Sequence, residues 1–453
     1  MFFSSQTLEE ILNGSWKEGK GCSVSGVYTD TRSEGNGKLF VALAGERFDA
    51  HNFLDKAVES GAAALCVRCG AAVPAGIPVI EVDDTLKAYQ ALGSFCRSSV
   101  DGLETVAVTG SVGKTSVKEM LRAIFSFACG KEHVLATEGN TNNHVGVPQN
   151  LLKLEKHHRF AVIEMGMNHP GEILPLTMTA KPDAAVVNSI APCHIEHLGS
   201  LEGIAIEKGS IFQGLPADGI AVIPADIPQT GLLKKAAGNR RILCFGTREN
   251  CDVSAKYLGG RLEGALFELT FKGAGTFRIS WHLSGKHQAL NASAAAAAAW
   301  SMGIAPQTIC EALPQTVLPG MRSKIIRLDD VVYVNDAYNA NPASMAAALD
   351  YLAESVKNEH LVLLLGAMLE LGDNSKSEHE KLLAAALARF PQADIFTFGE
   401  PFAEVSASCG VRFFKEPASA KEAVRAVVTP GSVVFAKGSR GIGVENVLPD
   451  GAK

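Results

Sequence analysis

The sequence predicts an α/β protein of three domains whose central domain is a doubly wound, mostly parallel sheet. Its 453 residues exceed what one hydrophobic core usually organises, and a length of roughly 150 residues per domain gives about three domains. Short apolar runs end repeatedly at polar residues, which is typical of parallel strands that present ligand sites at their carboxyl ends. Helical patterns lie between these runs, so strands and helices alternate along the chain.

Five apolar runs support this prediction. They are Val106–Val108 before Thr109 and Gly110, Phe160–Ile163 before Glu164, Ala184–Val187 before Asn188, Val331–Val334 before Asn335 and Asp336, and Val433–Ala436 before Lys437. The first run is followed by apolar residues at the spacing of one helix face, namely Val117, Met120, Leu121, Ile124 and Phe125. Residues 106–125 are therefore expected to form a strand, a loop and a helix.

Two interruptions of the pattern suggest where the domains meet. One lies near Ser98–Gly102, and the other near Leu318–Arg322, where a Pro-Gly pair breaks the periodicity. We expect domains at residues 1–100, 101–319 and 320–453. The uncharged, alanine-rich stretch Gln288–Cys310 contains several polar residues, so a buried helix is expected there and not a membrane span.

The composition excludes several classes of protein. With 47% hydrophobic and 20% charged residues, the chain is typical of folded globular proteins. Its net charge of −6, with basic residues clustered only as pairs, argues against a nucleic acid partner. The N-terminus lacks the pattern of a secretion signal, and ten cysteines are scattered without a zinc or disulfide framework. We expect reduced core thiols in a cytoplasmic protein.

A glycine-containing loop follows the first strand and opens the first helix. Its residues are Gly110, Ser111, Val112, Gly113, Lys114, Thr115 and Ser116. Backbone N–H groups and the helix dipole can converge there on phosphate oxygens, with Lys114 near the β- and γ-phosphates and a hydroxyl on Mg²⁺. The longer template has another glycine where this chain has Val108, so the match is the shorter GxxGK[ST]. The loop predicts an ATP site, and an ordinary strand-to-helix turn is the alternative.

The segment Thr109–Ser116, followed by Gly139–Asn143 and the strand that ends at Glu164, resembles the ATP-binding core of the Mur ligase family. Members of this family build the peptide of peptidoglycan, and the resemblance extends from about Val24 to Val447. It implies that ATP phosphorylates a carboxylate, with Lys114 acting in the transfer, and that an amine attacks the acyl phosphate. Such chemistry needs Mg²⁺ and fixed cations to neutralise developing charge.

The resemblance also implies two Mg²⁺ ions, with ligands from Thr115, Glu164, His194 and Lys208. Glu164 is a hard oxygen ligand, although a salt-bridged or capping glutamate is the alternative. His194 could instead be a hydrogen-bonded loop residue, and His197 competes with it. Lys208 resembles the lysine that related ligases carry as a carbamate, because an ammonium group cannot ligate a cation. A lysine paired with a phosphate or an acid is the alternative.

For the nucleotide, the resemblance places Asn291 at adenine, since an amide can donate and accept at once; a helix cap is the alternative. The segment Asn335–Met345 resembles that of the members that add D-alanyl-D-alanine, which implies that Asp336 and Asn339 contact the nucleotide. Arg322 would then meet phosphate charge. In the related Gly-Asp-Met stretch, this chain has Ala367 in place of the acid.

The partners implied are UDP-N-acetylmuramoyl-tripeptide and D-alanyl-D-alanine. The resemblance implies a central P-loop-type sheet flanked by an N-terminal UDP-sugar-binding α/β domain and a C-terminal Rossmann-like α/β domain, in a monomer. One rival is another ligase of this fold, adding a single amino acid or extending a folate glutamate tail. The other is a P-loop regulator or motor. The expected substrate contacts are Thr31, Arg32, Arg47, Asn140, Asn143, Lys437, Ser439 and Arg440.

Overall fold

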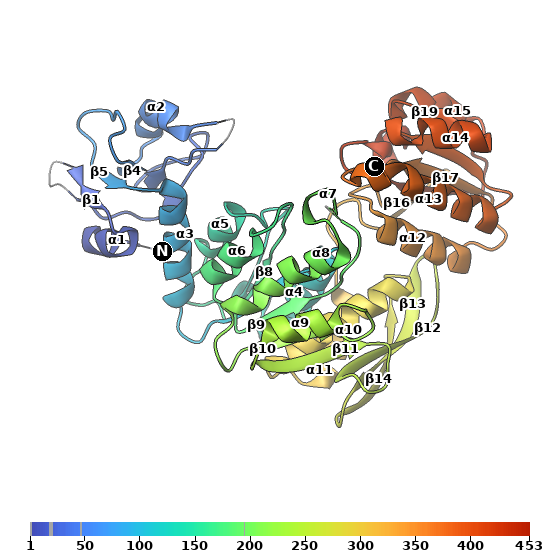
Figure 1. Ribbon diagram of the computed structural model, residues 1–453, viewed down its shortest axis with the longest axis horizontal. Helices are drawn as coiled ribbons and strands as arrows, with labels where there is room; N and C mark the ends of the chain where they lie inside the picture. Colours follow the sequence, from blue (N-terminus) through green and yellow to red (C-terminus); the bar gives the residue numbers. More distant parts are fainter. Residues whose placement is uncertain (1, 18–20, 46–47, 194) are drawn as a thin grey trace.

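The computed structural model describes residues 2–17, 21–45, 48–193 and 195–453, and it contains three β-sheets in three lobes (Figure 1). The strands of the first sheet fall within residues 15–82, those of the second within 104–281 and those of the third within 324–437. Each lobe therefore forms from one continuous stretch of the chain. The predicted three-lobed α/β fold is confirmed.

The first lobe contains a five-stranded sheet in the order β1-β5-β4-β3-β2. The pairing of β1 with β5 is antiparallel and the other pairings are parallel. Helix α3 leads from this lobe into the central one, and the Asp84 side chain caps its N-terminus by accepting from two backbone N–H groups. The elements are α1 (Ser5–Leu12), β1 (Ser15–Trp16), β2 (Val27–Tyr28), β3 (Leu39–Val41), α2 (Leu54–Glu59), β4 (Ala64–Arg68), β5 (Val79–Val82) and α3 (Thr85–Ser98).

The central lobe contains a nine-stranded sheet in the order β14-β13-β12-β11-β10-β9-β6-β8-β7. The strands from β7 to β12 are paired in parallel, and β12, β13 and β14 form an antiparallel extension. Strand β6 lies between β8 and β9, so the chain turns to one side of β6 and later to the other. Such a reversal opens a crevice at the carboxyl ends of the strands, where ligands bind in α/β folds.

The bounds of the central elements are as follows. The strands are β6 (Glu104–Thr109), β7 (Val134–Ala136), β8 (Phe160–Glu164), β9 (Ala184–Val187), β10 (Ile220–Pro224), β11 (Arg241–Gly246), β12 (Val253–Arg261), β13 (Gly264–Phe271) and β14 (Gly275–Trp281). The α-helices are α4 (Lys114–Cys129), α5 (Gly146–Leu151), α6 (Ile173–Ala180), α7 (Ile195–Leu198), α8 (Leu201–Gly209), α9 (Thr230–Ala237), α10 (Lys286–Ser301) and α11 (Pro306–Ala312).

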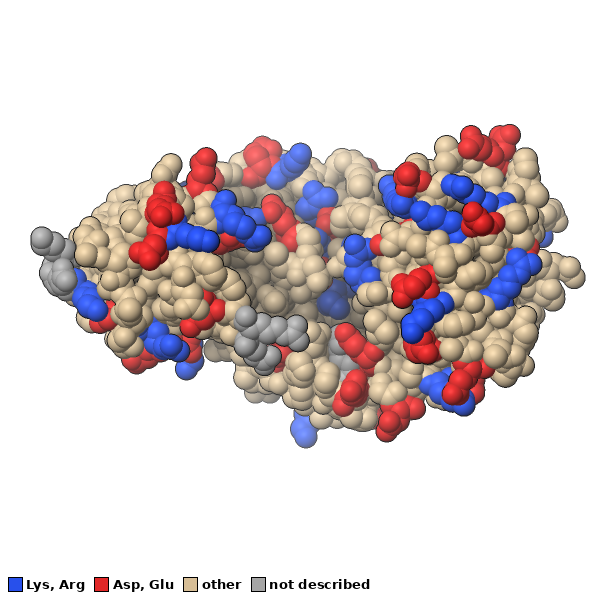
Figure 2. All heavy atoms as spheres, turned by 90° about the horizontal axis from the view of Figure 1, so that it is seen from above, with Lys and Arg blue, Asp and Glu red and all other residues tan. Residues whose placement is uncertain are grey.

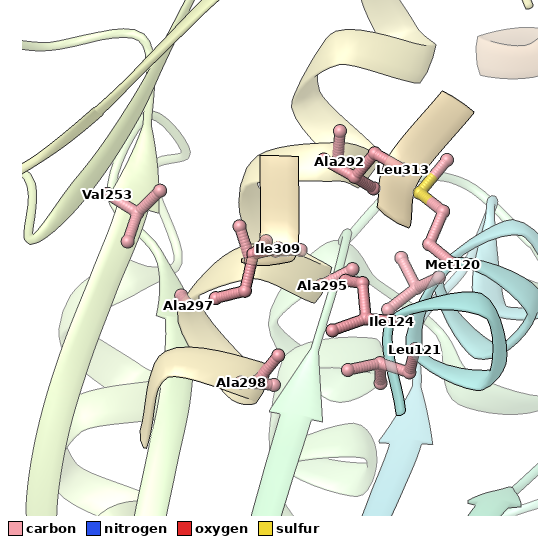
Figure 3. Packing of buried hydrophobic residues seen from close by; sticks show 14 of the residues in the cluster. Met120, Leu121, Ile124, Val253, Ala292, Ala295, Ala297, Ala298, Ile309 and Leu313 are labelled. Atoms are coloured by element: carbon pink, nitrogen blue, oxygen red, sulfur yellow. The ribbon is translucent and has the colours of Figure 1, made fainter. Parts of the chain in front are cut away.

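The alanine-rich helix α10 is buried against α4, the helix that follows the phosphate loop. Residues 294–299 are all alanine and all have 0% exposure, and Figure 3 shows Met120, Leu121 and Ile124 of α4 close to Ala295 of α10. Small side chains let the two helices approach closely in a densely packed core. The prediction of a buried helix is confirmed. None of the helices in the described residues is long and apolar enough to cross a membrane.

The third lobe contains a six-stranded sheet in the order β15-β16-β20-β17-β18-β19, parallel except for the edge strand β15. Strand β20 lies between β16 and β17, so the loops that follow these three strands meet at one edge. The elements are β15 (Lys324–Leu328), β16 (Val331–Asn335), α12 (Pro342–Ser355), β17 (Leu361–Gly366), α13 (Ser375–Arg389), β18 (Asp394–Phe398), α14 (Ala403–Cys409), β19 (Arg412–Phe414), α15 (Lys421–Arg425) and β20 (Val433–Lys437).

All five predicted strands are present as β6, β8, β9, β16 and β20. All ten cysteines are free thiols, as expected. The expectation that they lie in the core is only partly right, because Cys69 and Cys409 are exposed. The buried ones are Cys66, Cys96, Cys193, Cys251 and Cys310.

Candidate active site

A cavity of about 1,040 Å³ lies where the three lobes meet, and seen from above the molecule is hollowed between its two outer lobes (Figure 2). Lys87 of the first lobe, Lys114 of the central lobe and Lys437 of the third lobe all line it. The carboxyl ends of β6, β8 and β9 open into it, as do loops of the third sheet. Most of the predicted site residues are therefore brought into one space.

The phosphate loop joins β6 to α4. Gly113 has a φ of +84° at the N-terminus of α4, and a Cβ there would lie 2.5 Å from Asn291 Oδ1, so a side chain would clash. The Lys114 ammonium donates to Gly110 O over 2.8 Å. Because α4 begins at Lys114, its unpaired N-terminal N–H groups can bind an anion beside this loop.

The segment that follows β9 holds the phosphate loop in shape. Ser111 N donates to Ser189 O over 3.0 Å, and Val112 N donates to Ser189 Oγ over 2.9 Å. Asn188 Nδ2 donates to Val112 O over 2.6 Å, and Ser111 Oγ donates to Ala191 O over 2.9 Å. Sequence reasoning noted Asn188 only as a strand end. These hydrogen bonds come from the segment after β9, the strand next to β6, and they hold the phosphate loop in its conformation.

Glu164 lies at the end of β8 with 1% exposure. Its carboxylate accepts a hydrogen bond from Thr115 Oγ1 over 2.9 Å and one from Asn142 Nδ2 over 2.8 Å. Its backbone N–H donates to Thr137 Oγ1 over 2.9 Å. Asn142 was missed from the sequence, although it stands in the same Gly139–Asn143 stretch as two residues that were predicted.

The residues around Glu164 fit a Mg²⁺ ion. A carboxylate and a hydroxyl within 2.9 Å of each other are the hard oxygen donors that Mg²⁺ takes from proteins, with phosphate and water completing its shell. Within the described part of the chain, no group of three or more His, Cys, Asp or Glu side chains is arranged to hold a metal by itself. His194 lies outside the described residues.

Lys208 is buried in α8 with 1% exposure. Burial lowers the pKa of its ammonium to about 7, and the nearby Lys114 charge lowers this pKa as well, whereas Cys193 and Glu207 act in the opposite direction. A large fraction of this amine is then neutral near pH 7, which is the form that reacts with carbon dioxide.

His197, the alternative to His194, lies in α7 with its ring 4.4 Å from that of His169.

The third lobe contributes two cations to the cavity. Lys437, at the end of β20, has its ammonium 2.6 Å from Asp336 Oδ2 and donates to Asn339 O over 3.0 Å. Arg322 stacks on the Tyr338 ring at 3.5 Å from its centroid. Tyr338 was not predicted. The Tyr338 ring holds the guanidinium of Arg322 in place by a cation–π contact.

Asn291 lies in the second turn of α10 and lines the cavity. Its Oδ1 accepts from Asn188 Nδ2 over 3.3 Å. The alternative of a helix cap is wrong, because Gly285 occupies the N-cap position. His287 of the same helix also lines the cavity, and sequence reasoning missed it. Burial lowers the pKa of its imidazole to about 4, Asp336 opposes this, and Lys437 adds to it.

Several predicted substrate residues lie elsewhere. Arg32 is exposed and pairs with Asp30 over 2.7 Å, and neither it nor Thr31 lines the cavity. Arg440 is outside the cavity as well, with its guanidinium 2.7 Å from Glu445. Arg47 lies outside the described residues. Among the described residues of the first lobe, those that line the cavity lie at the start of α3, between Asp84 and Gln90.

The other predicted residues differ in whether they line the cavity. Asn140 and Asn143 line the cavity, and Asn143 Oδ1 accepts from Gly146 N over 2.9 Å at the start of α5. Ser439 does not line the cavity and has 4% exposure. Gly110 and Lys208 do not line the cavity either.

Comparison with known proteins matches this architecture to one family. Residues 108–299 match the model of the Mur ligase middle domain, and residues 321–440 match that of the Mur ligase, glutamate ligase domain. The chain is 37% identical over 446 residues to a protein of Escherichia coli strain K12 named UDP-N-acetylmuramoyl-tripeptide--D-alanyl-D-alanine ligase. That alignment covers 97% of this chain and 96% of the relative.

Solved structures agree with the sequence relatives. A crystal structure of MurF from Acinetobacter baumannii matches with a TM-score of 0.93 and 32% identity, over 100% of this chain and 99% of that one. MurF from Thermotoga maritima in complex with ADP matches with a TM-score of 0.81 and 27% identity, over 93% of this chain and 96% of that one. The similarity thus includes all three lobes.

Proposed function

This chain belongs to the Mur ligase family, and on that premise we propose that it joins D-alanyl-D-alanine to UDP-N-acetylmuramoyl-tripeptide at the expense of ATP. The relatives named for this reaction align with nearly the whole chain. The observation that carries the proposal is the single cavity in which the phosphate loop, Glu164 and the third-lobe cations Arg322 and Lys437 meet. The reaction belongs to the synthesis of peptidoglycan precursors.

The residues of the cavity have distinct roles in this proposal. The N–H groups of residues 110–116 and the Lys114 ammonium bind the β- and γ-phosphates of ATP. Thr115 and Glu164 would hold Mg²⁺, which neutralises charge on the phosphates when it is bound. Arg322 and Lys437 add positive charge from the third lobe. ATP phosphorylates the terminal carboxylate of the tripeptide, and the amine of D-alanyl-D-alanine displaces phosphate from the acyl phosphate.

Enclosure by three lobes supports this chemistry. A cavity walled on three sides keeps water from the acyl phosphate, which would otherwise hydrolyse, and holds amine and carbonyl together. We propose that Asn291 meets adenine, because it lines the cavity beside the phosphate loop. Asp336 and Asn339 would contact the nucleotide.

A second Mg²⁺ site is proposed at His194 and a carbamylated Lys208. The support for the carbamate is the burial of Lys208 and the lowered pKa of its amine, which provide the neutral form needed for reaction with carbon dioxide. The protein is proposed to be a cytoplasmic monomer. We also propose domain boundaries at residues 1–100, 101–319 and 320–453, because the strands of the three sheets fall within these ranges.

For the substrates, the proposal keeps the contacts implied by the family resemblance. Asn140, Asn143 and Lys437 have support from their positions in the cavity wall. The remaining residues, Thr31, Arg32, Arg47, Ser439 and Arg440, stay predictions from the resemblance.

Phosphate release from the purified protein tests the proposal. We expect release from MgATP only when muramyl tripeptide and D-alanyl-D-alanine are both present, with mass spectrometry detecting the UDP-linked pentapeptide. Equal release without the two peptides would favour a P-loop regulator or motor. Efficient use of a single amino acid in place of the dipeptide would favour another ligase of the same fold.

A further inference from the structure

A buried lysine, Lys118, lies in α4 three residues after Thr115. Its side chain has 2% exposure. The Lys118 ammonium donates to Thr137 O over 2.8 Å and lies 2.7 Å from Glu119 Oε1. Residues three apart on a helix lie on the same side of it, and Thr115 contacts Glu164 at the end of β8. Lys118 therefore extends the contact between α4 and the strand ends from β8 to the neighbouring strand β7.

Thr137 links Lys118 to Glu164, the proposed metal ligand. It follows β7 directly and has 1% exposure. Its Oγ1 accepts from Glu164 N over 2.9 Å, and its backbone N–H donates to Val162 O over 2.9 Å. Thr137 thus continues the pairing of β7 with β8, and the position of the Glu164 backbone depends on it.

These contacts form a closed ring that begins and ends in α4. Lys118 donates to Thr137 O, and Thr137 Oγ1 accepts from Glu164 N. The Glu164 carboxylate then accepts from Thr115 Oγ1 over 2.9 Å, which returns the ring to α4. Because two members of the ring belong to one helix, it restricts how far the carboxylate and the hydroxyl can move apart.

The charge on Lys118 is costly to bury. A buried ion pair is often no more stabilising than apolar side chains of the same size, and the Glu119 carboxylate is also paired with Arg122 through its other oxygen. A purely structural role at this position could therefore be met by an apolar side chain. A carbonyl oxygen such as that of Thr137 can be held only by a donor, which an ammonium group provides.

We propose that Lys118 is a positioning residue for the Mg²⁺ site and acts through Thr137 to hold Glu164 beside Thr115. This inference rests on the proposed function, in which Thr115 and Glu164 would hold the ion. Lys118 does not line the cavity, so its effect passes through the ring of contacts and not through the nucleotide. Residues that orient metal ligands typically contribute about 10- to 100-fold to metal affinity.

Isothermal titration of ADP at several Mg²⁺ concentrations tests the inference without catalysis. Lys118→Met keeps a long side chain and removes the ammonium. We expect the Mg²⁺ concentration that gives half of the Mg²⁺-dependent gain in ADP affinity to rise about 10- to 100-fold. Without Mg²⁺, the affinity for ADP should stay within about twofold of wild type, because the backbone N–H groups of the phosphate loop remain in place.

A double variant tests whether the effect passes through Glu164. In protein that already carries Glu164→Gln, adding Lys118→Met should change the Mg²⁺ requirement by less than about twofold, because the ligand that Lys118 positions is already lost. An independent effect of Lys118 would instead add in full to that of Glu164→Gln.

Arg122→Met is the matched control. Arg122 pairs with the same Glu119 carboxylate, but its side chain is 42% exposed, and Thr137 O accepts from Lys118. Its variant should keep the wild-type Mg²⁺ requirement within about twofold, because an exposed member of an ion pair contributes little. Thermal unfolding of all the variants checks that α4 stays folded.

Thr137→Val provides a second test that does not depend on the folding of Lys118→Met. It keeps the backbone oxygen that Lys118 holds and removes the hydroxyl that accepts from Glu164 N. We expect the same selective rise in the Mg²⁺ requirement. If Lys118→Met does not fold, a wild-type Mg²⁺ requirement in Thr137→Val overturns the inference.

Three further results would overturn it. The first is an unchanged Mg²⁺ requirement in folded Lys118→Met. The second is equal weakening of ADP binding with and without Mg²⁺, which would show that Lys118 only supports the helix. The third is a full additional loss in the Glu164→Gln background. If wild-type protein binds ADP equally with and without Mg²⁺, the metal site of the proposed function fails first, before any variant is compared.

Discussion

Arg322 Nη2 donates a hydrogen bond to Thr115 Oγ1 over 3.2 Å, although 207 positions separate the two residues. Thr115 belongs to the phosphate loop of the central lobe, and Arg322 lies just before the first strand of the third lobe. The bond joins a cation of one lobe to the hydroxyl that donates to Glu164 in another. The third lobe thus reaches the site where phosphate is expected.

Replacing Arg322 tests this connection. Arg322→Ala removes a guanidinium that is stacked on Tyr338 and can bind phosphate oxygens with two N–H groups. We expect kcat/KM for ATP to fall about 10- to 100-fold, the range for hydrogen bonds to charged groups. Arg412→Ala is the control, because Arg412 also lies over an aromatic ring of the third lobe, that of Phe396 at 5.2 Å. Similar losses in both variants would point to a general effect of destabilising the lobe.

Lys114→Ala should abolish turnover and leave the fold intact. The Lys114 ammonium donates one hydrogen bond, to Gly110 O, within the described part of the chain, so its loss removes little packing. Stabilisation of a transferring phosphoryl group typically contributes about 10²- to 10³-fold to kcat, and the lysine is expected to supply at least that. Steady-state kinetics and a thermal unfolding scan measure the two effects. Near-normal turnover would remove Lys114 from the mechanism.

Much of the site could be predicted because strand ends and a glycine loop are local signals. Thr109, Glu164 and Asn188 follow apolar runs, and parallel pairing brings them together. The hydrogen bonds from Ser189 and Asn188 to the phosphate loop could not be predicted. They depend on which strand lies next to β6. The same holds for Tyr338 under Arg322, a contact created by the approach of two loops.

Two other predicted residues lie outside the cavity wall, and each already has partners within the protein. Arg32 looked suited to a diphosphate, but its guanidinium is paired with Asp30 within the same turn. Ser439 looked like a substrate contact, yet its hydroxyl accepts from Leu369 N and donates to Ala340 O over 3.2 Å. A sequence shows which side chains can bind charge, but not which of them the protein already uses for its own loops.

Removing the carboxylate at Glu164 should change the need for magnesium. Glu164→Gln keeps the size of the side chain but replaces an anionic ligand with a neutral amide, which binds Mg²⁺ more weakly. We expect a large rise in the Mg²⁺ concentration that gives half-maximal activity, and chelation of Mg²⁺ should stop wild-type turnover. Isothermal titration of ADP with and without Mg²⁺ measures the same effect without catalysis. Asn142→Ala should have a smaller effect, because Asn142 only orients the carboxylate.

Carbon-13 NMR tests the proposed carbamate on Lys208. Protein equilibrated with ¹³C-bicarbonate should show a carbamate resonance that is absent from Lys208→Arg, since a guanidinium is not carbamylated. Lys234→Arg is the control, because it replaces another lysine that does not line the cavity. This variant should keep the carbamate resonance. A spectrum without a resonance that depends on Lys208 would leave an ordinary lysine there, and the second Mg²⁺ site would lose that ligand.

The imidazole of His287 should make stability depend on pH in mild acid. Burial lowers its pKa to about 4 in the folded protein, whereas an unfolded histidine has a pKa of about 6.5. Between these values the unfolded chain binds the additional proton, so the free energy of unfolding contributed by this group falls as pH drops from about 6.5 to about 4. Above about 6.5 the histidine is neutral in both states and its contribution is constant.

A glutamine at position 287 cannot bind this proton. Urea unfolding of wild type and His287→Gln at several pH values should therefore show a shallower loss of stability in the variant between about pH 6.5 and pH 4. Lys437 lies close to the ring and disfavours its protonation, while Asp336 favours it. Lys437→Met should accordingly raise the pKa of His287, as NMR titration of the ring would show. The loss of stability below about pH 6.5 should then be smaller and should end at a higher pH than in the wild type. Parallel pH profiles for wild type and His287→Gln would mean that the ring takes up its proton equally well in the folded state.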